Sequence, residues 1–475
     1  MNISMFGREE EKKILLSLLD SDKSEFVAVY GRRRVGKTYL IRETYNYTFA
    51  FQHTGLQEAT LDEQLEEFAN SLIIAGMRSV KKPKSWSQAF FMLSQYLTTL
   101  PEGKKVIFID ELPWLDTINS KFVSALDHFW NAWATSRKDI VLVVCGSATS
   151  WIIDKIVMNY GGLHNRLTEQ IYLRPFTLSE CEEYAQQRQL GMSRRNILET
   201  YMVLGGIPFY WDMLRRDLSW AQNIDRMCFY PNGKMRNEFN ALYKSLFRSP
   251  QIYIDVVSVL GTKKIGMTRS ELIENLGTNN GGTLTRVLRE LEQCDFIRTY
   301  NSIGKTKKES VYQLIDNFTL FYFKFMNSSI NDKDFWSRTI SKPTYAVWSG
   351  LAFERVCFQH IDQIKQALGI SGVISNLYSW VYKPKDPQEK GVQIDMLIDR
   401  DDNVINICEI KFAQGEYELT EKYDLDLRNK ISTFVQKTKT RKGVSLVMIT
   451  SNGLKRNAWA NGVQREVTMD DLFKK

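Results

Sequence analysis

The sequence predicts a multidomain α/β protein, and three observations support this prediction. A chain of 475 residues is too long for one ordinary hydrophobic core, so two to four domains are expected. In the N-terminal third, short β-branched and aromatic runs are followed by glycine-containing turns and helical patterns, as in a parallel sheet covered by helices. Near the C-terminus, two alternating segments joined by turn residues indicate a β-hairpin that belongs to another domain.

Composition narrows the class of protein. Hydrophobic residues make up 43% of the chain and aromatic residues 12%, as in globular proteins. The charged N-terminus lacks the apolar segment of a signal peptide, and the longest apolar runs are far shorter than the ~20 residues that span a bilayer. The six cysteines are scattered and form no CxxC pair, which is typical of a reduced, cytoplasmic protein without disulfides or structural zinc. Any catalytic metal should therefore be a hard cation bound by carboxylates.

One loop carries a complete phosphate-binding pattern, GxxxxGK[ST]. The stretch "FVAVYGRRRVGKTYLIRETY" reads as a strand, a glycine-containing turn and a helix, which is the context that the pattern requires. Its amides would curl around phosphate oxygens at the positive end of the helix, with the lysine on the β and γ phosphates and the threonine on Mg²⁺. The residues expected in this nucleotide-binding loop are Gly31, Arg32, Arg33, Arg34, Val35, Gly36, Lys37 and Thr38. The three arginine side chains are expected to face solvent or an interface rather than the phosphates.

The second half of the nucleotide site is expected about 70 residues further on, in "KKVIFIDELPWL". Its apolar residues form a buried strand, and Asp110 and Glu111 emerge at the carboxyl end, where open α/β sheets bind ligands. Asp110 would hold Mg²⁺ through water, and Glu111 would polarise the attacking water. A third strand, "IVLVVCGSA", ends at Ser147, which is placed to sense the γ-phosphate. The combination predicts ATP hydrolysis as well as binding.

This order of motifs resembles the AAA+ superfamily. The further markers "MFGREEE" and "LGGIPFYW" resemble the archaeal-type ATPases of its STAND branch, so the resemblance covers residues 1–245. It implies that Arg166, just before another strand, reaches the nucleotide of a neighbouring subunit in a homo-oligomer. It also implies that Pro208, in a Gly-x-Pro element of the helical lid, contacts the nucleotide. A structural cap at Arg166 and a plain turn at Pro208 are the alternatives.

The middle of the chain follows a winged-helix pattern. "MTRSELIENLG" opens with a capping box of Thr268 and Glu271, and a third helix and a strand–loop–strand follow. DNA contact is expected from exposed residues of the third helix and from the wing, although contact with protein alone is the alternative. These residues are Thr283, Thr285, Arg286, Arg289, Lys305, Lys307 and Lys308.

The C-terminal hairpin, "VQIDMLIDR" followed by "VINICEIKF", places acids on one face. If Ile405 pairs with Asp399, then Asp395 lies across from Glu409, and Lys411 shares that face because it is two residues further on. Facing carboxylates repel each other unless a cation such as Mg²⁺ lies between them. Asp395 and Glu409 are therefore the expected metal ligands.

The helix, hairpin and E-x-K order resembles the PD-(D/E)xK nuclease superfamily, with the acid in "QID" instead of "PD". The resemblance implies that Glu354, Asp395, Glu409 and Lys411 are catalytic. Residues 430–475 add ten Lys and Arg against three acids, a net charge of +7 that suits a polyanion. The alternative without a function is that the acids at the hairpin end and the basic residues of the C-terminal segment simply face solvent.

These motifs predict five segments and one function. The segments are an ATPase core at 1–175, a helical lid at 176–245, a winged helix at 246–325, a connector at 326–342 and a nuclease-like domain at 343–475. The function is a DNA-directed ATPase whose nucleotide state, with ATP and Mg²⁺ as cofactors, controls a Mg²⁺-dependent nuclease. The alternative is a STAND-type regulator whose C-terminal domain binds nucleic acid or a protein partner without cleaving.

Overall fold

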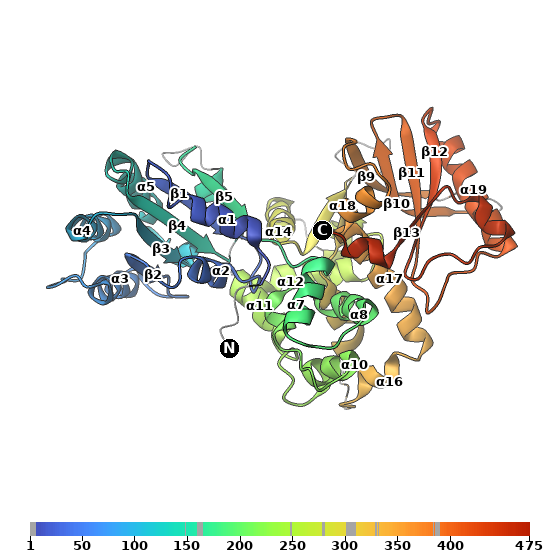
Figure 1. Cartoon of the computed structure of the whole chain (residues 1–475), viewed down its shortest axis with the longest axis horizontal. Coiled ribbons are helices and arrows are strands. Elements are labelled where there is room, and N and C mark those ends of the chain that lie inside the picture. Colours follow the sequence, from blue (N-terminus) through green and yellow to red (C-terminus); the bar gives the residue numbers. More distant parts are fainter. Residues whose placement is uncertain are drawn as a thin grey trace. The chain divides into compact units, whose positions relative to one another are not determined.

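The computed structural model describes residues 6–147, 149–158, 165–247, 249–277, 281–300, 310–327, 330, 332–382, 384 and 390–475. The chain divides into two compact units, Met1–Pro175 and Phe176–Lys475, which are described separately (Figure 1). Among the described residues, no helix combines the length and apolarity needed to cross a membrane.

The first unit is built on a five-stranded parallel sheet with the order β2-β3-β4-β1-β5. The strands are β1 (Glu25–Tyr30), β2 (Phe51–Thr54), β3 (Lys105–Asp110), β4 (Ile140–Gly146) and β5 (Glu169–Tyr172). Three of them, β1, β3 and β4, follow the apolar runs that predict strands, and β5 is the strand expected just after Arg166. The fifth, β2, is short and half polar ("FQHT"), so its sequence carries no strand pattern; it is a strand because it pairs with β3.

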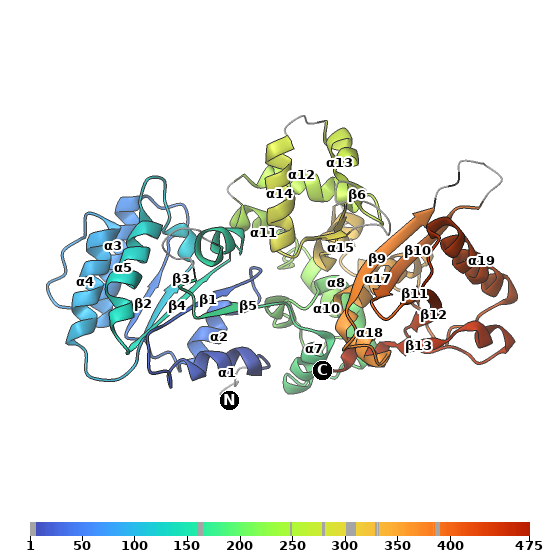
Figure 2. The same ribbon diagram turned by 90° about the horizontal axis from the view of Figure 1, so that it is seen from above.

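Helices cover both faces of this sheet, as parallel strands require. They are α1 (Glu9–Ser17), α2 (Lys37–Thr44), α3 (Leu61–Ala75), α4 (Trp86–Thr99), α5 (Phe122–Ala132) and α6 (Thr149–Ile152), with the shorter turns η1 (Leu112–Trp114), η2 (Ala134–Ser136) and η3 (Ile153–Val157). Figure 2 shows α3, α4 and α5 on one side and α1 and α2 on the other. Phe68, Trp86 and Phe122 fill the core under α3–α5. The carboxyl edge of the sheet is left for polar side chains.

The second unit begins with short helices, in the stretch expected to be helical. They are α7 (Leu178–Gln187), α8 (Arg194–Leu204), α9 (Pro208–Trp211), α10 (Trp220–Ile224), η4 (Asp225–Phe229), α11 (Glu238–Leu246) and α12 (Pro250–Gly261). The α7 helix starts at a capping box, in which Thr177 accepts from the Glu180 amide and Glu180 accepts from the Thr177 amide. Such caps satisfy the first amides of each helix and fix where it begins.

Two helices and a three-stranded antiparallel sheet follow. They are α13 (Arg269–Leu276), α14 (Gly281–Gln293), β6 (Met267–Thr268), β7 (Ile297–Tyr300) and β8 (Val311–Leu314), with sheet order β6-β8-β7. The capping box between Thr268 and Glu271 is formed as predicted. Leu284, Val287, Leu288 and Leu291 bury one face of α14, while Arg286 and Arg289 lie on its exposed face. The expected wing residues Lys305, Lys307 and Lys308 lie outside the described residues.

The C-terminal part holds a second five-stranded sheet, of mixed direction, with the order β13-β12-β11-β10-β9. Its strands are β9 (Ser375–Tyr382), β10 (Val392–Arg400), β11 (Val404–Lys411), β12 (Gly443–Thr450) and β13 (Arg465–Thr468). The helices of this part are α15 (Asn317–Phe321), η6 (Tyr322–Met326), α16 (Phe335–Thr339), α17 (Pro343–Gln359), α18 (Ile361–Ala367), α19 (Glu421–Thr438), η7 (Ala458–Gly462) and η8 (Met469–Phe473). Leu427 and Phe434 of α19 pack on Ile394 and Ile405 of the sheet. The loop of the hairpin between β10 and β11 is residues 401–403.

Candidate nucleotide and metal sites

The predicted phosphate-binding loop lies between β1 and α2, at the carboxyl end of the sheet of the first unit. Gly31 and Gly36 have φ values of 145° and 91°, a region that side chains strongly disfavour. A Cβ atom at Gly31 would also lie 2.4 Å from the carbonyl oxygen of Leu173. The two glycines are therefore required by the backbone path, and the loop amides are free to curve around a phosphate group.

Lys37 is buried at the base of this loop. Its ammonium donates to the carbonyl oxygens of Gly31 and Arg32, each at 3.0 Å, and to the hydroxyl of Ser147 at 3.4 Å. Two of these acceptors follow β1 and the third follows β4. They hold the ammonium between the loop and the end of β4. This is the position in which a lysine can pair with the terminal phosphates of a nucleotide.

Thr38 and Asp110 meet across the sheet edge. The threonine hydroxyl donates a 2.9 Å hydrogen bond to one carboxylate oxygen of Asp110, and Cys145 donates to the other at 2.6 Å. Burial, and then the charge of Asp110, raise the pKa of the Cys145 thiol well above its usual value, so this thiol stays protonated. A hydroxyl beside a carboxylate is a set of hard oxygen donors, which fits Mg²⁺ as predicted.

Glu111 follows Asp110 in a left-handed backbone conformation, with φ of 47°. Its carboxylate accepts from both the amide and the hydroxyl of Ser147, the latter at 2.9 Å. The predicted water-polarising acid and the predicted γ-phosphate sensor therefore lie in direct contact beside Lys37. A single edge of the sheet brings together Lys37, Thr38, Asp110, Glu111 and Ser147.

Arg166 and Pro208 are the two other residues predicted to contact a nucleotide. Arg166 is exposed in a turn before β5. Pro208 is in the second unit, where it starts α9. The structure requires a glycine at the neighbouring position 206. The Gly206 carbonyl accepts a 2.6 Å hydrogen bond from the amide of Phe176, and a Cβ there would overlap the Phe176 backbone. The roles of Arg166 and Pro208 toward a nucleotide stay predictions.

The C-terminal hairpin has the predicted register. Ile405 pairs with Asp399, and the ladder runs on to Met396 opposite Cys408. Asp395 and Glu409 are the next residues beyond the last recorded pair, at the same end of the hairpin. A bulge between Ile394 and Leu397, in the pairing of β10 with β9, accompanies this end of the ladder. The side chains of Asp395 and Glu409 nevertheless find different partners.

Glu409 is 2% exposed and is surrounded by cations. Its two carboxylate oxygens pair with Lys411 at 2.9 Å and with Lys430 at 2.8 Å, and the hydroxyl of Tyr423 donates to the first of them. Burial alone would raise the pKa of Glu409, but the two lysines outweigh it and hold the pKa below its usual value. Glu409 is therefore an ionised carboxylate fixed by three donors.

Asp395 and Glu354 form a second acidic pair. Both accept from the ammonium of Lys264, at 3.2 Å and 2.9 Å, and Gln393 also donates to Asp395 at 2.7 Å. Burial, and then the nearby charge of Asp395, raise the pKa of Glu354 to about 7. Lys264 opposes this rise. The helix α17 thus delivers Glu354 to the hairpin, as the sequence predicts.

Asp395 and Glu409 contact different cations, Lys264 in the first case and Lys411 and Lys430 in the second, and their role as ligands of one metal stays a prediction. Among the described residues, no group of three or more His, Cys, Asp or Glu side chains is placed to hold a metal ion. Lysine ammoniums pair with these acids instead: Lys264 with Glu354 and Asp395, and Lys430 with Glu409. The donor set of carboxylate oxygens still fits Mg²⁺ in kind.

Sequence patterns missed three residues of this cluster. Lys430 and Tyr423 lie on α19, whose helical pattern could have been found in the basic C-terminal segment. Lys264 has no signal in the sequence, because 90 and 131 residues separate it from the two acids that it contacts.

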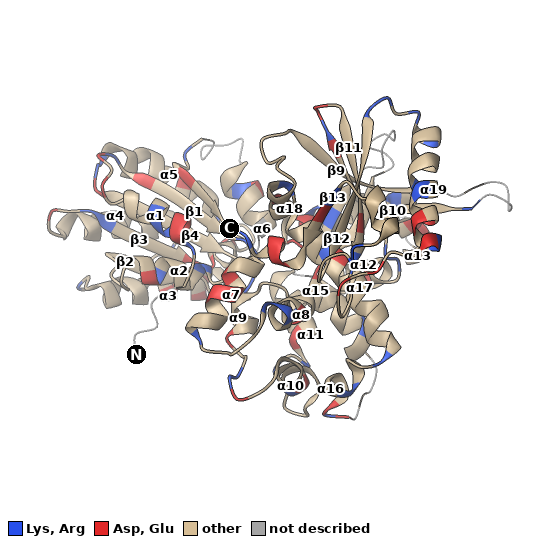
Figure 3. Ribbon diagram, turned by 45° about the vertical axis from the view of Figure 1, so that its right-hand side comes forward, with Lys and Arg blue, Asp and Glu red and all other residues tan. Residues whose placement is uncertain are grey.

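The basic C-terminal segment is less free than its net charge suggests. Among the described residues, at least five of its ten cations pair with acids, and four of those acids precede residue 430. The pairs are Lys430–Glu409, Lys442–Asp399, Lys455–Glu418, Lys474–Asp471 and Lys475–Glu183. Figure 3 shows acidic segments beside basic ones along α19. A count along the chain misses such pairs because they form across the fold.

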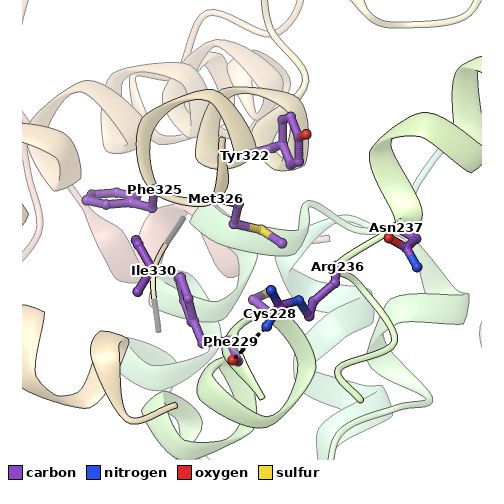
Figure 4. A pocket seen from close by; sticks show the side chains of 8 residues that line it. All are labelled: Cys228, Phe229, Arg236, Asn237, Tyr322, Phe325, Met326 and Ile330. Atoms are coloured by element: carbon purple, nitrogen blue, oxygen red, sulfur yellow. Dashed lines mark hydrogen bonds between the residues drawn. The ribbon is translucent and has the colours of Figure 1, made fainter. Parts of the chain in front are cut away.

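The second unit also contains a cavity of about 150 Å³ next to η4 and η6. Phe229, Tyr322, Phe325 and Met326 line it together with Arg236 and Asn237, and Arg236 donates a 3.3 Å hydrogen bond to the Phe229 carbonyl (Figure 4). None of the described residues that line it is an acid.

Comparisons with known proteins agree with the geometry of the first site. A family model described as "ATPase domain predominantly from Archaea" matches residues 5–214. The Methanocaldococcus jannaschii protein MJECL04, itself uncharacterized, is 23% identical over 430 residues, covering 89% of this chain and 91% of that protein.

Solved structures of other proteins are similar to this chain in fold. The Walker-type ATPase PABY2304 of Pyrococcus abyssi has a TM-score of 0.50 and 18% identity, covering 68% of this chain and 96% of that chain. The ORC2 protein of Aeropyrum pernix has a TM-score of only 0.38 at 13% identity, covering 66% of this chain and 91% of that chain, which supports no functional argument. Residues 5–214 are therefore similar to an archaeal-type ATPase domain, and the chain shares its fold with a Walker-type ATPase over 68% of its length.

Proposed function

We propose that the protein is an ATP-driven switch or motor that acts on DNA, in which nucleotide state controls a C-terminal Mg²⁺-dependent nuclease of PD-(D/E)xK type. In this proposal residues 176–245 are a lid, 246–325 a winged helix, 326–342 a connector and 343–475 the nuclease-like domain. The ATPase domain supplies the energy-dependent step. The element order of the second unit supports the remaining assignments.

The observation that carries the nuclease proposal is the buried acidic cluster at one end of the hairpin. Glu354, Asp395 and Glu409 are 15%, 13% and 2% exposed, and Lys411 reaches the last of them. Burying charged groups away from water costs free energy. The acids at the end of an ordinary hairpin would instead be exposed to solvent. Titratable groups with shifted pKa values gather preferentially at functional sites.

The chain's own residues have distinct roles in the proposed cleavage. Asp395 and Glu409 would hold Mg²⁺, which when bound activates water and neutralises charge on a phosphodiester. Lys411 would position the nucleophile or stabilise the developing negative charge. Glu354, on α17, would add a third carboxylate to the site.

The test is nicking of supercoiled plasmid DNA with Mg²⁺ or Mn²⁺, with and without ATP. Wild type is compared with Lys37→Ala, with Lys411→Ala and with the surface control Lys455→Ala. We expect Lys411→Ala to lose about 100-fold or more in cleavage while still binding ATP. Lys37→Ala should abolish the effect of ATP on nicking, and Lys455→Ala should match wild type.

A second candidate function is a STAND-type regulator that binds nucleic acid or a protein partner without cutting. The observation in its favour is that lysines, not a preformed metal cage, neutralise the acids. DNA binding without cleavage under any nucleotide state would select this candidate. Absence of any affinity for nucleic acid would leave an ATPase that acts on protein.

A further inference from the structure

The turn between α12 and β6 places a lysine in the acidic cluster. Lys264 contributes its ammonium to Glu354 of α17 at 2.9 Å and to Asp395 of β10 at 3.2 Å. The acids lie 90 and 131 residues further along the chain. These two ion pairs therefore join separate segments of the second unit.

The Lys264 turn, residues 263–266, is held in place by its own small sheet. Gln313 of β8 donates a 2.6 Å hydrogen bond to the Lys264 carbonyl, and the hydroxyl of Tyr300 of β7 donates to the Ile265 carbonyl. Gly266 ends the turn with φ of 86°, and a Cβ there would lie 2.2 Å from the Tyr312 carbonyl oxygen. The backbone of the turn that carries Lys264 is thus held in place, and the two ion pairs fix its ammonium.

The same sheet is fastened to the helix that carries Glu354. The Arg298 guanidinium of β7 lies 3.4 Å from the centroid of the Phe358 ring, and Phe358 is one helical turn beyond Glu354. Arg298 also donates a 2.7 Å hydrogen bond to Gln313, which holds the Lys264 turn. One chain of contacts therefore runs from Phe358 through Arg298 and Gln313 to Lys264.

The contact leaves little room for another ligand. The cavity between the Lys264 turn, α17 and β10 has a volume of about 20 Å³. That is enough for about one water molecule and too small for a phosphodiester group. The ammonium already supplies the positive charge that the two carboxylates need.

We propose that Lys264 is a built-in counter-ion that keeps the acidic cluster closed. Its ammonium occupies Asp395, which the proposed function makes a metal ligand, and the adjacent Glu354, so metal binding requires the Lys264 turn to move away. This inference rests on the proposed function in treating these acids as a metal site. Metal binding can nevertheless be measured without any cleavage, which separates the two proposals.

The neighbouring lysine provides a matched control. Lys263 has nearly the same exposure, 36% against 35%, but pairs with Glu271 at 2.5 Å, away from the acidic cluster. Removing its charge perturbs the same turn without releasing Glu354 or Asp395.

The experiment measures binding of Mn²⁺ alone to the full chain by isothermal titration calorimetry, without nucleotide. Lys264→Met, which keeps the aliphatic stem, should bind Mn²⁺ at least 10-fold more tightly than wild type. Lys263→Met and Lys264→Arg should match wild type. The gain should vanish in Lys264→Met/Asp395→Asn, which shows that the metal binds at this cluster and not at Thr38. Lys264→Gln is the substitute if Lys264→Met fails to fold.

Each outcome decides the inference. Unchanged or weaker Mn²⁺ binding in Lys264→Met overturns it, and so does an equal gain in Lys264→Arg or Lys263→Met. Tighter Mn²⁺ binding without DNA cleavage supports the closed-site inference and removes the proposed nuclease activity. If plasmid nicking falls in Lys264→Met while metal binding does not improve, Lys264 assists cleavage and the inference is wrong.

Discussion

The hydroxyl of Thr38 donates a 2.9 Å hydrogen bond to the carboxylate of Asp110, 72 residues further along the chain. This bond joins the phosphate-binding loop to β3, and it assembles the predicted Mg²⁺ ligands on one sheet edge. Glu111 and Ser147 lie next to it. Binding and hydrolysis of the nucleotide should therefore be separable by substitution.

We expect Glu111→Gln to retain ATP binding and to lose about 100-fold or more in hydrolysis, because the amide cannot polarise water as a carboxylate does. Lys37→Ala should instead weaken ATP binding about 10-fold or more. Equilibrium binding of a fluorescent ATP analogue and phosphate release measure the two effects. Equal loss of ATP binding in both variants would contradict the assigned roles.

Gly31→Ala should destabilise the first unit by about 3 kcal/mol, the sum of an unfavourable positive φ and a backbone overlap. The control is Gly103→Ala, because Gly103 also has a positive φ but has nothing within 4 Å of the position of its Cβ. That variant should lose only about 1 kcal/mol. Urea unfolding followed by tryptophan fluorescence gives both values. Similar losses would mean that the Leu173 carbonyl moves aside.

Lys430→Met should lower the free energy of unfolding by about 2 kcal/mol, because it removes one donor from the buried carboxylate of Glu409. Lys455→Met should change it by less than about 0.5 kcal/mol, since the Lys455–Glu418 pair is more than half exposed. In a double-mutant cycle, Glu409→Gln should remove most of the effect of Lys430→Met. Additive effects would show that Lys430 acts through its packing.

His360 should make the second unit less stable in acid. Burial lowers the pKa of His360 to about 4, against an ordinary value of 6.5, and its Nε2 accepts the amide of Leu178 at 2.9 Å. The unfolded chain therefore takes up the proton first, and stability is lost as the pH falls from 6.5 towards 4. The loss should reach about 2 kcal/mol at pH 5.

Urea unfolding at pH 7 and pH 5 measures this loss, and His360→Gln is the comparison. The variant should show a smaller difference between the two pH values, although His53, which is also buried with a lowered pKa, keeps part of it. An unchanged difference would exclude His360 as the cause.

Arg166→Ala tests the expected oligomer. If Arg166 reaches the nucleotide of a neighbouring subunit, ATP hydrolysis per protomer should rise with protein concentration in wild type and fall about 100-fold or more in the variant. Lys138→Ala, at another exposed cation, should behave as wild type. Hydrolysis that depends neither on concentration nor on Arg166 would end this hypothesis.

The sequence by itself determined the local parts of both sites. The spacing of Gly31, Gly36, Lys37 and Thr38 sets a loop that folds within a few residues, so its chemistry can be read directly. The period of two along β10 and β11 likewise showed that a pairing of Asp399 with Ile405 would place Asp395 across from Glu409, and the structure has this pairing.

Only the tertiary structure decided which charges neutralise the acids. Lys264 and Lys430 reach Glu354, Asp395 and Glu409 from distant segments, and an ion pair between distant residues leaves no period or spacing in the sequence. The same reason explains why the basic C-terminal segment looked freer than it is. The strand β2 could not be predicted from the sequence either. A short and half-polar strand is stabilised by the strand beside it and not by its own residue pattern.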